Sequence, residues 1–184
     1  MLRNAIRGLA AVSFVLAVSG HPVSAGDVIF QGAPFNSSVG FAMDFSPDMK
    51  AFTVTFSGLE AIVLPGDLAS PIATRVFSFS VPISGADVGQ EIPFFVQGMA
   101  DLDKGTNAQL MFAINDQSSM AYLPAESKDS FLHEFKYKAT GAKEARITVF
   151  LLTSRDSKAT ANAYLNVSSI DTDVLKHAKR AERR

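Results

Sequence analysis

The chain has 184 residues, a formal net charge of −1, 15 phenylalanines and neither cysteine nor tryptophan. This length fits one domain with a substantial hydrophobic core. The absence of cysteine excludes disulfides, thiol catalysis, cysteine-bound zinc and iron–sulfur clusters. The lack of excess basic charge argues against nucleic-acid binding, which depends on cations that neutralise phosphates.

The first 25 residues have the three parts of a secretory signal peptide. Arg3 and Arg7 precede the apolar run Leu9–Val18, and the small-residue stretch Val23–Ala25 follows. The alternative is a membrane anchor, but a spanning helix needs about 20 apolar residues and this run has about half that number. We therefore predict cleavage after Ala25 or one residue later, and a secreted or periplasmic protein that does not span the membrane after signal cleavage.

The remainder of the chain shows a period of two, which is typical of β-strands. In the segment 50–57, for example, Phe52, Val54 and Phe56 share one face. The segment 145–154 is apolar on both sides past its middle, which predicts a central strand. We predict about nine strands, over residues 39–45, 50–57, 59–64, 74–82, 92–102, 107–115, 130–138, 145–154 and 160–167.

Turn-forming residues separate these strands. Ser46–Asp48 and Leu64–Asp67 contain proline at a turn position, and Gly66 can supply a positive φ. Residues 103–105 are predicted to be a short hairpin connection, and Asp116–Asp129 the longest loop. With no amphipathic helix between the strands, the pattern predicts an antiparallel β-sandwich over residues 26–170, of the jelly-roll or immunoglobulin-like type.

Residues 171–184 differ from the rest, because they carry five basic and three acidic side chains. The acids lie mostly at the start and the bases at the end, as the helix dipole favours. We predict either a short C-terminal helix or a disordered basic tail.

The sequence offers few residues for catalysis. His177 lies in the basic tail, and His133 lies on the apolar face of a predicted strand, where a hydrogen-bonded structural histidine is expected. His133-Glu134 lacks the second histidine of a metalloprotease motif, since Tyr137 stands there. No nucleophile elbow or phosphate loop occurs. We predict no catalytic residues and no enzyme activity.

No metal or cofactor site is predicted either. Asp101, Asp103 and Asn107 surround Gly105 and faintly resemble a calcium loop, but the oxygen ligands that such a loop requires further on are missing. We interpret this segment as a polar turn.

Tyr122 is a candidate recognition residue, because it falls within the predicted loop Asp116–Asp129. The alternative is a ring folded back onto the edge of the sandwich. The lack of tryptophan weakens the case for sugar stacking.

The stretch Phe45–Asp48 with the strand Ala51–Phe56, then Arg75–Val81, Val96–Gly105 and Ala108–Phe112, resembles a secreted β-rich domain family of unknown function found in fungi and bacteria. The resemblance covers about residues 39–115. Members usually carry cysteines, which this chain lacks. It implies an exported β-rich domain and supplies no catalytic residues.

Two classes of function follow. The first is an exported, non-enzymatic module that binds an envelope or extracellular partner, protein or glycan, through its loops. The alternative is a structural surface subunit that associates with itself through an exposed sheet edge or apolar patch.

Overall fold

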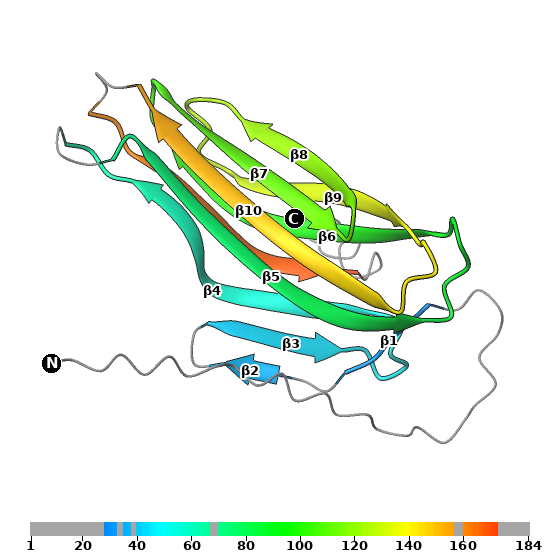
Figure 1. Ribbon diagram of the computed structural model, residues 1–184. Coiled ribbons are helices and arrows are strands. Elements are labelled where there is room, and N and C mark those ends of the chain that lie inside the picture. Colours follow the sequence, from blue (N-terminus) through cyan, green and yellow to red (C-terminus); the bar gives the residue numbers. More distant parts are fainter. Residues whose placement is uncertain (1–27, 33–34, 38–39, 67–69, 157–159, 173–184) are drawn as a thin grey trace, which may run out of the picture.

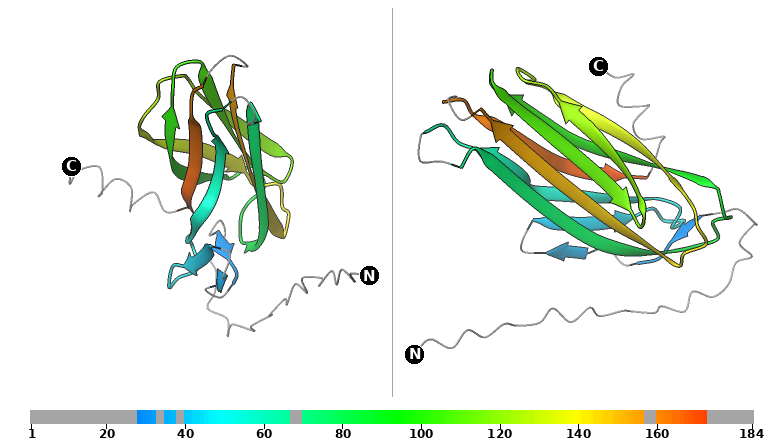
Figure 2. Two further views of the ribbon diagram at one scale, coloured as in Figure 1. Left: turned by 90° about the vertical axis from the view of Figure 1, so that its left-hand side faces the viewer. Right: turned by 45° about the horizontal axis from the view of Figure 1, so that its top comes forward.

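The computed structural model describes residues 28–172, apart from 33–34, 38–39, 67–69 and 157–159. Two antiparallel β-sheets pack face to face, as Figures 1 and 2 show. The predicted signal peptide and nearly all of the predicted tail lie outside the described residues. Within those residues there is no helix, and so no helix long and apolar enough to cross a membrane.

The five-stranded sheet has the order β1-β5-β10-β7-β8. Its strands are β1 (Ile29–Phe30), β5 (Ile72–Ser84), β10 (Glu144–Arg155), β7 (Thr106–Ile114) and β8 (Gln117–Leu123). The six-stranded sheet has the order β2-β3-β4-β11-β6-β9. Its strands are β2 (Phe35–Ser37), β3 (Phe41–Phe45), β4 (Phe52–Val63), β11 (Ala163–Asp171), β6 (Glu91–Leu102) and β9 (Ser130–Lys138). The prediction of an antiparallel β-sandwich is confirmed.

Most connections pass from one sheet to the other. β2–β3, β3–β4 and β7–β8 pair as neighbours within a sheet. Ser46–Asp48 forms the predicted turn of the β3–β4 hairpin, in which Ala51 N donates to Ser46 Oγ at 2.9 Å. The hairpin predicted at residues 103–105 is wrong, because this turn joins β6 to β7 in opposite sheets. Alternation identifies a strand but not its partner.

Besides the short strands β1 and β2, the sequence failed to predict β8. It occupies the first half of Asp116–Asp129, where a loop was expected. Its inward positions include the polar residue Ser119 and the small residue Ala121, so they do not produce the alternation of large apolar residues that marks a strand. Its start is fixed by the two-residue turn after Ile114, in which Asn115 adopts a positive φ of 54°.

β4 contains both predicted segments 50–57 and 59–64 in one strand with a bulge. Val167 of β11 pairs with Leu59 of β4, but Ser169, two residues further along β11, pairs with Thr55, four residues away on β4. Phe52 and Val54 are buried before the bulge, and Leu59 after it, so the buried positions change from even to odd numbers. The bulge thereby keeps apolar side chains on the inner face along the whole strand.

Gly98 of β6 faces the same irregular part of β11. A Cβ atom at this position would overlap the carbonyl oxygen of Asn166, and it would lie 2.6 Å from the ring of Phe131. Only glycine therefore permits this close approach of the two strands.

The predicted inward residues form the core. Ala108, Leu110, Phe112 and Ile114 of β7 are at most 1% exposed. β10 lies between β5 and β7, as predicted for a central strand. The strand β11 extends through Asp171, which is buried and accepts hydrogen bonds from Thr53, Gln97 and Ser169. The first residue of the predicted tail is thus part of the sheet.

Thr153 of β10 points into this core with its hydroxyl unsatisfied. The residue is fully buried, and its Oγ1 has no hydrogen-bond partner within the described residues. Burying an unpaired hydroxyl costs about 1–3 kcal/mol.

We expect Thr153→Val to raise the free energy of unfolding by about 1 kcal/mol, because it replaces the hydroxyl by a methyl group of similar size. Urea denaturation measures this change. Thr148→Val is the control, because the Thr148 hydroxyl lies 2.9 Å from Ser78 Oγ on the outer face. A Thr153→Val protein no more stable than the wild type would contradict the assignment.

Candidate functional site

A row of apolar side chains crosses the outer face of the five-stranded sheet. Val76 of β5 pairs with Phe150 of β10, Phe150 with Met111 of β7, and Met111 with Met120 of β8. All four residues point away from the core. Val76 is 57% exposed and Met120 51% exposed. We call these four residues the apolar row.

Rows of mostly uncharged polar side chains flank the apolar row in register. On one side Thr74, Leu152, Gln109 and Tyr122 follow one another across β5, β10, β7 and β8. On the other side the order is Ser78, Thr148, Ala113 and Ser118.

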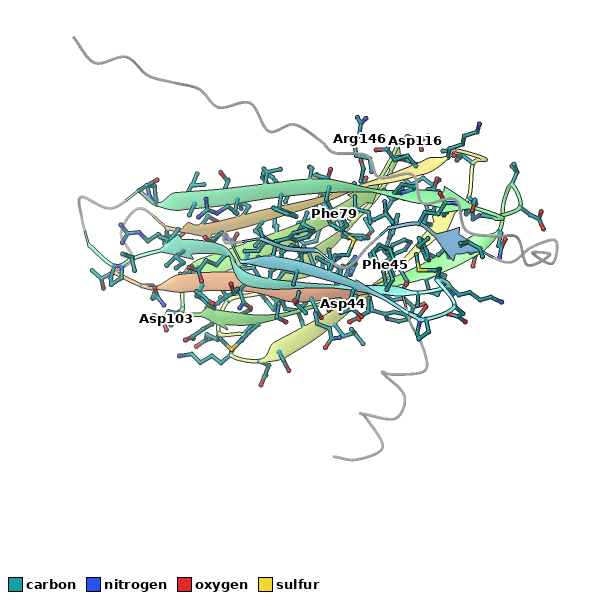
Figure 3. All side chains as sticks on the ribbon, turned by 90° about the horizontal axis from the view of Figure 1, so that it is seen from below. Asp44, Phe45, Phe79, Asp103, Asp116 and Arg146 are labelled. Atoms are coloured by element: carbon teal, nitrogen blue, oxygen red, sulfur yellow. The ribbon has the colours of Figure 1, made fainter. Side chains whose placement is uncertain are left out.

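We call the outward residues of these four strands the uncharged face. Glu144 and Arg146 are the exceptions, and both lie at the start of β10. Together with Asn115 they line a depression of about 330 Å³ at this end. Figure 3 shows Arg146 and Asp116 towards one end of the molecule and Asp103 towards the other.

The outer face of the six-stranded sheet has a different character. Its outward positions include Glu60, Asp101, Glu134, Lys136 and Lys138. Tyr164 donates to Glu60 at 3.2 Å, and burial together with this carboxylate raises the pKa of the Tyr164 phenol. The two faces of one sandwich therefore differ in charge.

His133 lies at the margin where β9 faces β8. Its Nε2 is 2.7 Å from Ser119 Oγ, which confirms the prediction of a hydrogen-bonded sheet residue. A serine and a histidine at this distance also form the first two members of a hydrolase triad. Among the described residues no carboxylate bonds the other ring nitrogen, and Phe112, the ladder partner of Ser119, is fully buried. The hydrogen bond joins β9 of one sheet to β8 of the other.

A second link reinforces this margin. The side-chain amide of Gln117 donates to Lys138 O at 2.8 Å and accepts from Lys138 N at 3.0 Å. The amide thus imitates one rung of a β-ladder between β8 and β9.

The three residues of the calcium-like segment do not converge. Asp101 and Asp103 both contact Lys128 Nζ, at 3.6 and 3.4 Å. Asn107 instead lies in the five-stranded sheet, where it accepts a hydrogen bond from Ser154 Oγ of the neighbouring strand at 2.8 Å. The Asn162 N–H and Lys128 hold the pKa of Asp103 below its ordinary value. In the part of the chain that the structure describes, no three His, Asp or Glu side chains are grouped as metal ligands.

Tyr122 lies on β8 and not in a loop, which corrects the prediction. Its side chain is 68% exposed on the uncharged face, and its hydroxyl is 3.5 Å from Met120 Sδ. The ring is therefore not folded onto the edge as a lid.

A shallow depression of about 390 Å³ lies at one end of the sandwich, among Gln31, Gly85, Ala86, Gly141 and Lys143. Tyr137 also lines it, and the Tyr137 hydroxyl accepts from Asn115 Nδ2 at 2.9 Å. Most of the side chains that line this depression are small, and Lys143 is the one charged residue among them, so few groups are available to bind a ligand.

The apolar row escaped prediction, although its signal was present. The segment 145–154 is apolar on both sides, and this was interpreted only as the mark of a central strand. Its outward residues Phe150 and Leu152 belong to the uncharged face. Only the strand register shows that they line up with residues far away in the sequence.

No protein-family model and no curated protein matches this sequence. Among solved structures, the carbohydrate-binding module TmCBM61 in complex with β-1,4-galactotriose is 8% identical, with a TM-score of 0.39 over 81% of this chain and 92% of that chain. The bacteriophage CBA120 tailspike protein 4 enzymatically active domain is 13% identical, with a TM-score of 0.33 over 79% of this chain and 19% of that chain. CBM4, a further carbohydrate-binding module, is 10% identical, with a TM-score of 0.27 over 73% of this chain and 80% of that chain. Likeness this weak carries no functional argument, and the resemblance to a secreted family stays a prediction.

The pKa of His133 is lowered from its ordinary value of 6.5, because burial disfavours the charged ring. The unfolded chain therefore binds the proton first as the pH falls. Stability that depends on the neutral ring is present above about pH 6.5 and is lost between that pH and the folded-state pKa.

We expect His133→Gln to reduce the loss of unfolding free energy between about pH 7.5 and about pH 5.5. Urea titrations at several pH values measure it. Ser119→Ala is the control, because it removes the hydrogen bond and keeps the titrating ring. Identical pH profiles for wild type and His133→Gln would refute the assignment.

Proposed function

We propose that this chain is an exported, non-enzymatic binding module that holds a neutral glycan on its uncharged face. The observation that carries the proposal is the apolar row, which crosses four strands in register with polar rows on both sides. An exposed, contiguous apolar patch with a polar rim is typical of an interaction site.

The partner is expected to be neutral because the centre of this face has no charge to pair with. A charged ligand would lose its hydration without gaining an ion pair. Arg146 and Glu144 lie at one end only and are opposite in sign. Binding should therefore depend little on salt.

The arrangement of the face favours a sugar chain over a protein. A sugar ring has apolar C–H groups on its faces and hydroxyl groups around its edge. The apolar row can receive the former, while Ser118, Thr74 and Gln109 can hydrogen-bond the latter. Protein interfaces are commonly centred on tryptophan, tyrosine or arginine anchors, and the apolar row contains none of these three residue types.

The non-enzymatic part of the proposal rests on the described polar groups. His133 and Ser119 are committed to joining β8 and β9. Asp101 and Asp103 are committed to Lys128. Export rests on the signal-peptide pattern of residues 1–25 and is tested by sequencing the N-terminus of the protein recovered outside the cytoplasm.

The binding test uses the full chain, expressed with its leader, and washed insoluble cellulose, curdlan and β-1,4-galactan as neutral glycans, with alginate beads as the anionic comparison. We expect saturable loss from solution on at least one neutral glycan, unchanged between low and moderate salt. Retention on alginate alone, abolished by salt, would overturn the proposal.

Val76→Asp should weaken that binding at least about tenfold, because the ligand must desolvate a carboxylate in the contact surface. Leu132→Asp is the matched control. Leu132 is 54% exposed against 57% for Val76, and it lies on the outer face of the other sheet. Depletion isotherms compare the two variants. Equal effects of both substitutions would show that the uncharged face is not the binding surface.

A further inference from the structure

β8 is a sheet margin with free backbone groups. Among the described residues it pairs with β7 on one side and with no strand on the other. Figure 1 shows it at the border of its sheet, beside β9 of the opposite layer. A strand in this position presents unpaired N–H and C=O groups to another chain.

The residues that carry these free groups follow from one hydrogen bond. Asn115 N donates to Arg146 O at 2.9 Å, so the odd residues at this end of β7 face β10. The even residues of β7 therefore face β8, where their partners are Gln117, Ser119, Ala121 and Leu123. Ser118, Met120 and Tyr122 are left with N–H and C=O groups that point outward.

β8 lacks the features that normally protect a sheet edge. Within Gln117–Leu123 there is no charged residue and no proline, and its pairing with β7 has no bulge. The neighbouring margin β9 carries Glu134, Lys136 and Lys138. Charged residues on an edge strand oppose pairing with a second chain, so this contrast favours β8 over β9.

We propose that a second copy of this chain pairs with β8 in antiparallel orientation across a two-fold axis at Met120. Met120 then lies opposite Met120 of the second copy, and Ser118 lies opposite Tyr122. Each pair exchanges two backbone hydrogen bonds, and no like charges meet.

The register follows from the residues that end the strand. A shift of two residues in one direction places Asp116, which belongs to the β7–β8 turn, opposite a strand residue. The shift in the other direction places Pro124 there, and proline has no N–H to donate. Centring on Met120 is the arrangement that satisfies all three free residues.

Continuity across the axis supports a second copy as the occupant. Met120 is the last member of the apolar row, so its pairing joins the row of one copy to the row of the other. Two five-stranded sheets become one ten-stranded sheet with a single uncharged face. This consequence rests on the proposed function, whereas the dimer itself does not.

The first experiment is sedimentation velocity of the full chain, without glycan, from about 1 to about 300 µM. Three residue pairs form a small contact, so a concentration-dependent monomer–dimer equilibrium in the micromolar range is expected. A monomer at every concentration would overturn the proposal.

A cross-linking experiment tests the register, because the native chain has no cysteine to interfere. Met120→Cys should form a disulfide-linked dimer on mild oxidation, since directly opposed, hydrogen-bonded residues have Cα atoms about 5.5 Å apart. Ser118→Cys is the matched control on the same edge. Its two copies lie four residues apart along the ladder, or about 13 Å, so it should stay monomeric alone and cross-link when mixed with Tyr122→Cys. Efficient cross-linking of Ser118→Cys alone, or none for Met120→Cys, would refute the arrangement.

Charge variants give a test that does not need oxidation. Met120→Glu and Met120→Lys should each weaken dimerisation at least tenfold, and an equimolar mixture should restore it, because opposite charges then meet at the axis. Val76→Asp, three strands away, should leave the dimer unchanged while it weakens glycan binding. Failure of the dimer and failure of the glycan site are thus separately visible. Failure of the mixture to recover would overturn the pairing at Met120.

Discussion

The sandwich depends on a chain of phenylalanine rings through its centre. Phe52 of β4 contacts Phe94 of β6, Phe94 contacts Phe112 of β7, and Phe112 contacts Phe135 of β9, with centroid separations of 6.0, 6.0 and 5.4 Å. These rings come from both sheets, so they hold the two layers together in a chain that has no disulfides. Because large rings fill the inner positions, the two outer faces are free to differ in composition.

The two outer faces differ in charge. The six-stranded sheet carries its charges outward, whereas the central part of the five-stranded sheet carries none. Polar substitution of Val76, Met111 or Met120 would cost the core nothing, because these side chains point away from it. An apolar row at positions without a packing role is better explained by contact with a partner than by folding. The same reasoning leaves Phe94 and Phe112 without functional meaning, since packing alone accounts for them.

The parts of the fold that the sequence predicted are those in which large apolar residues alternate. Strands such as β7 and β10 are evident because both are long and most of their inward positions are apolar. β8 was missed because Ser119 and Ala121 occupy its inward positions. The apolar row was missed for another reason: Val76, Met111 and Phe150 are far apart in sequence and meet only through strand order. Likewise, Lys128 lies 25 residues from Asp103, so its ion pairs with the calcium-like segment were invisible from spacing.

The weak inner side of β8 and its free edge have the same origin. With serine and alanine inside, this strand gains little from the core, and it is held by its turn at Asn115, by its ladder to β7 and by two polar links to β9. Gln117 and Ser119 reach across to β9 from alternate positions, and this leaves Ser118, Met120 and Tyr122 to the outside. The groups that tie β8 to β7 and β9 thus belong to its odd-numbered residues. The even-numbered residues carry the end of the apolar row and the backbone groups that face away from β7, so a partner that adds a strand at this margin also extends the uncharged face.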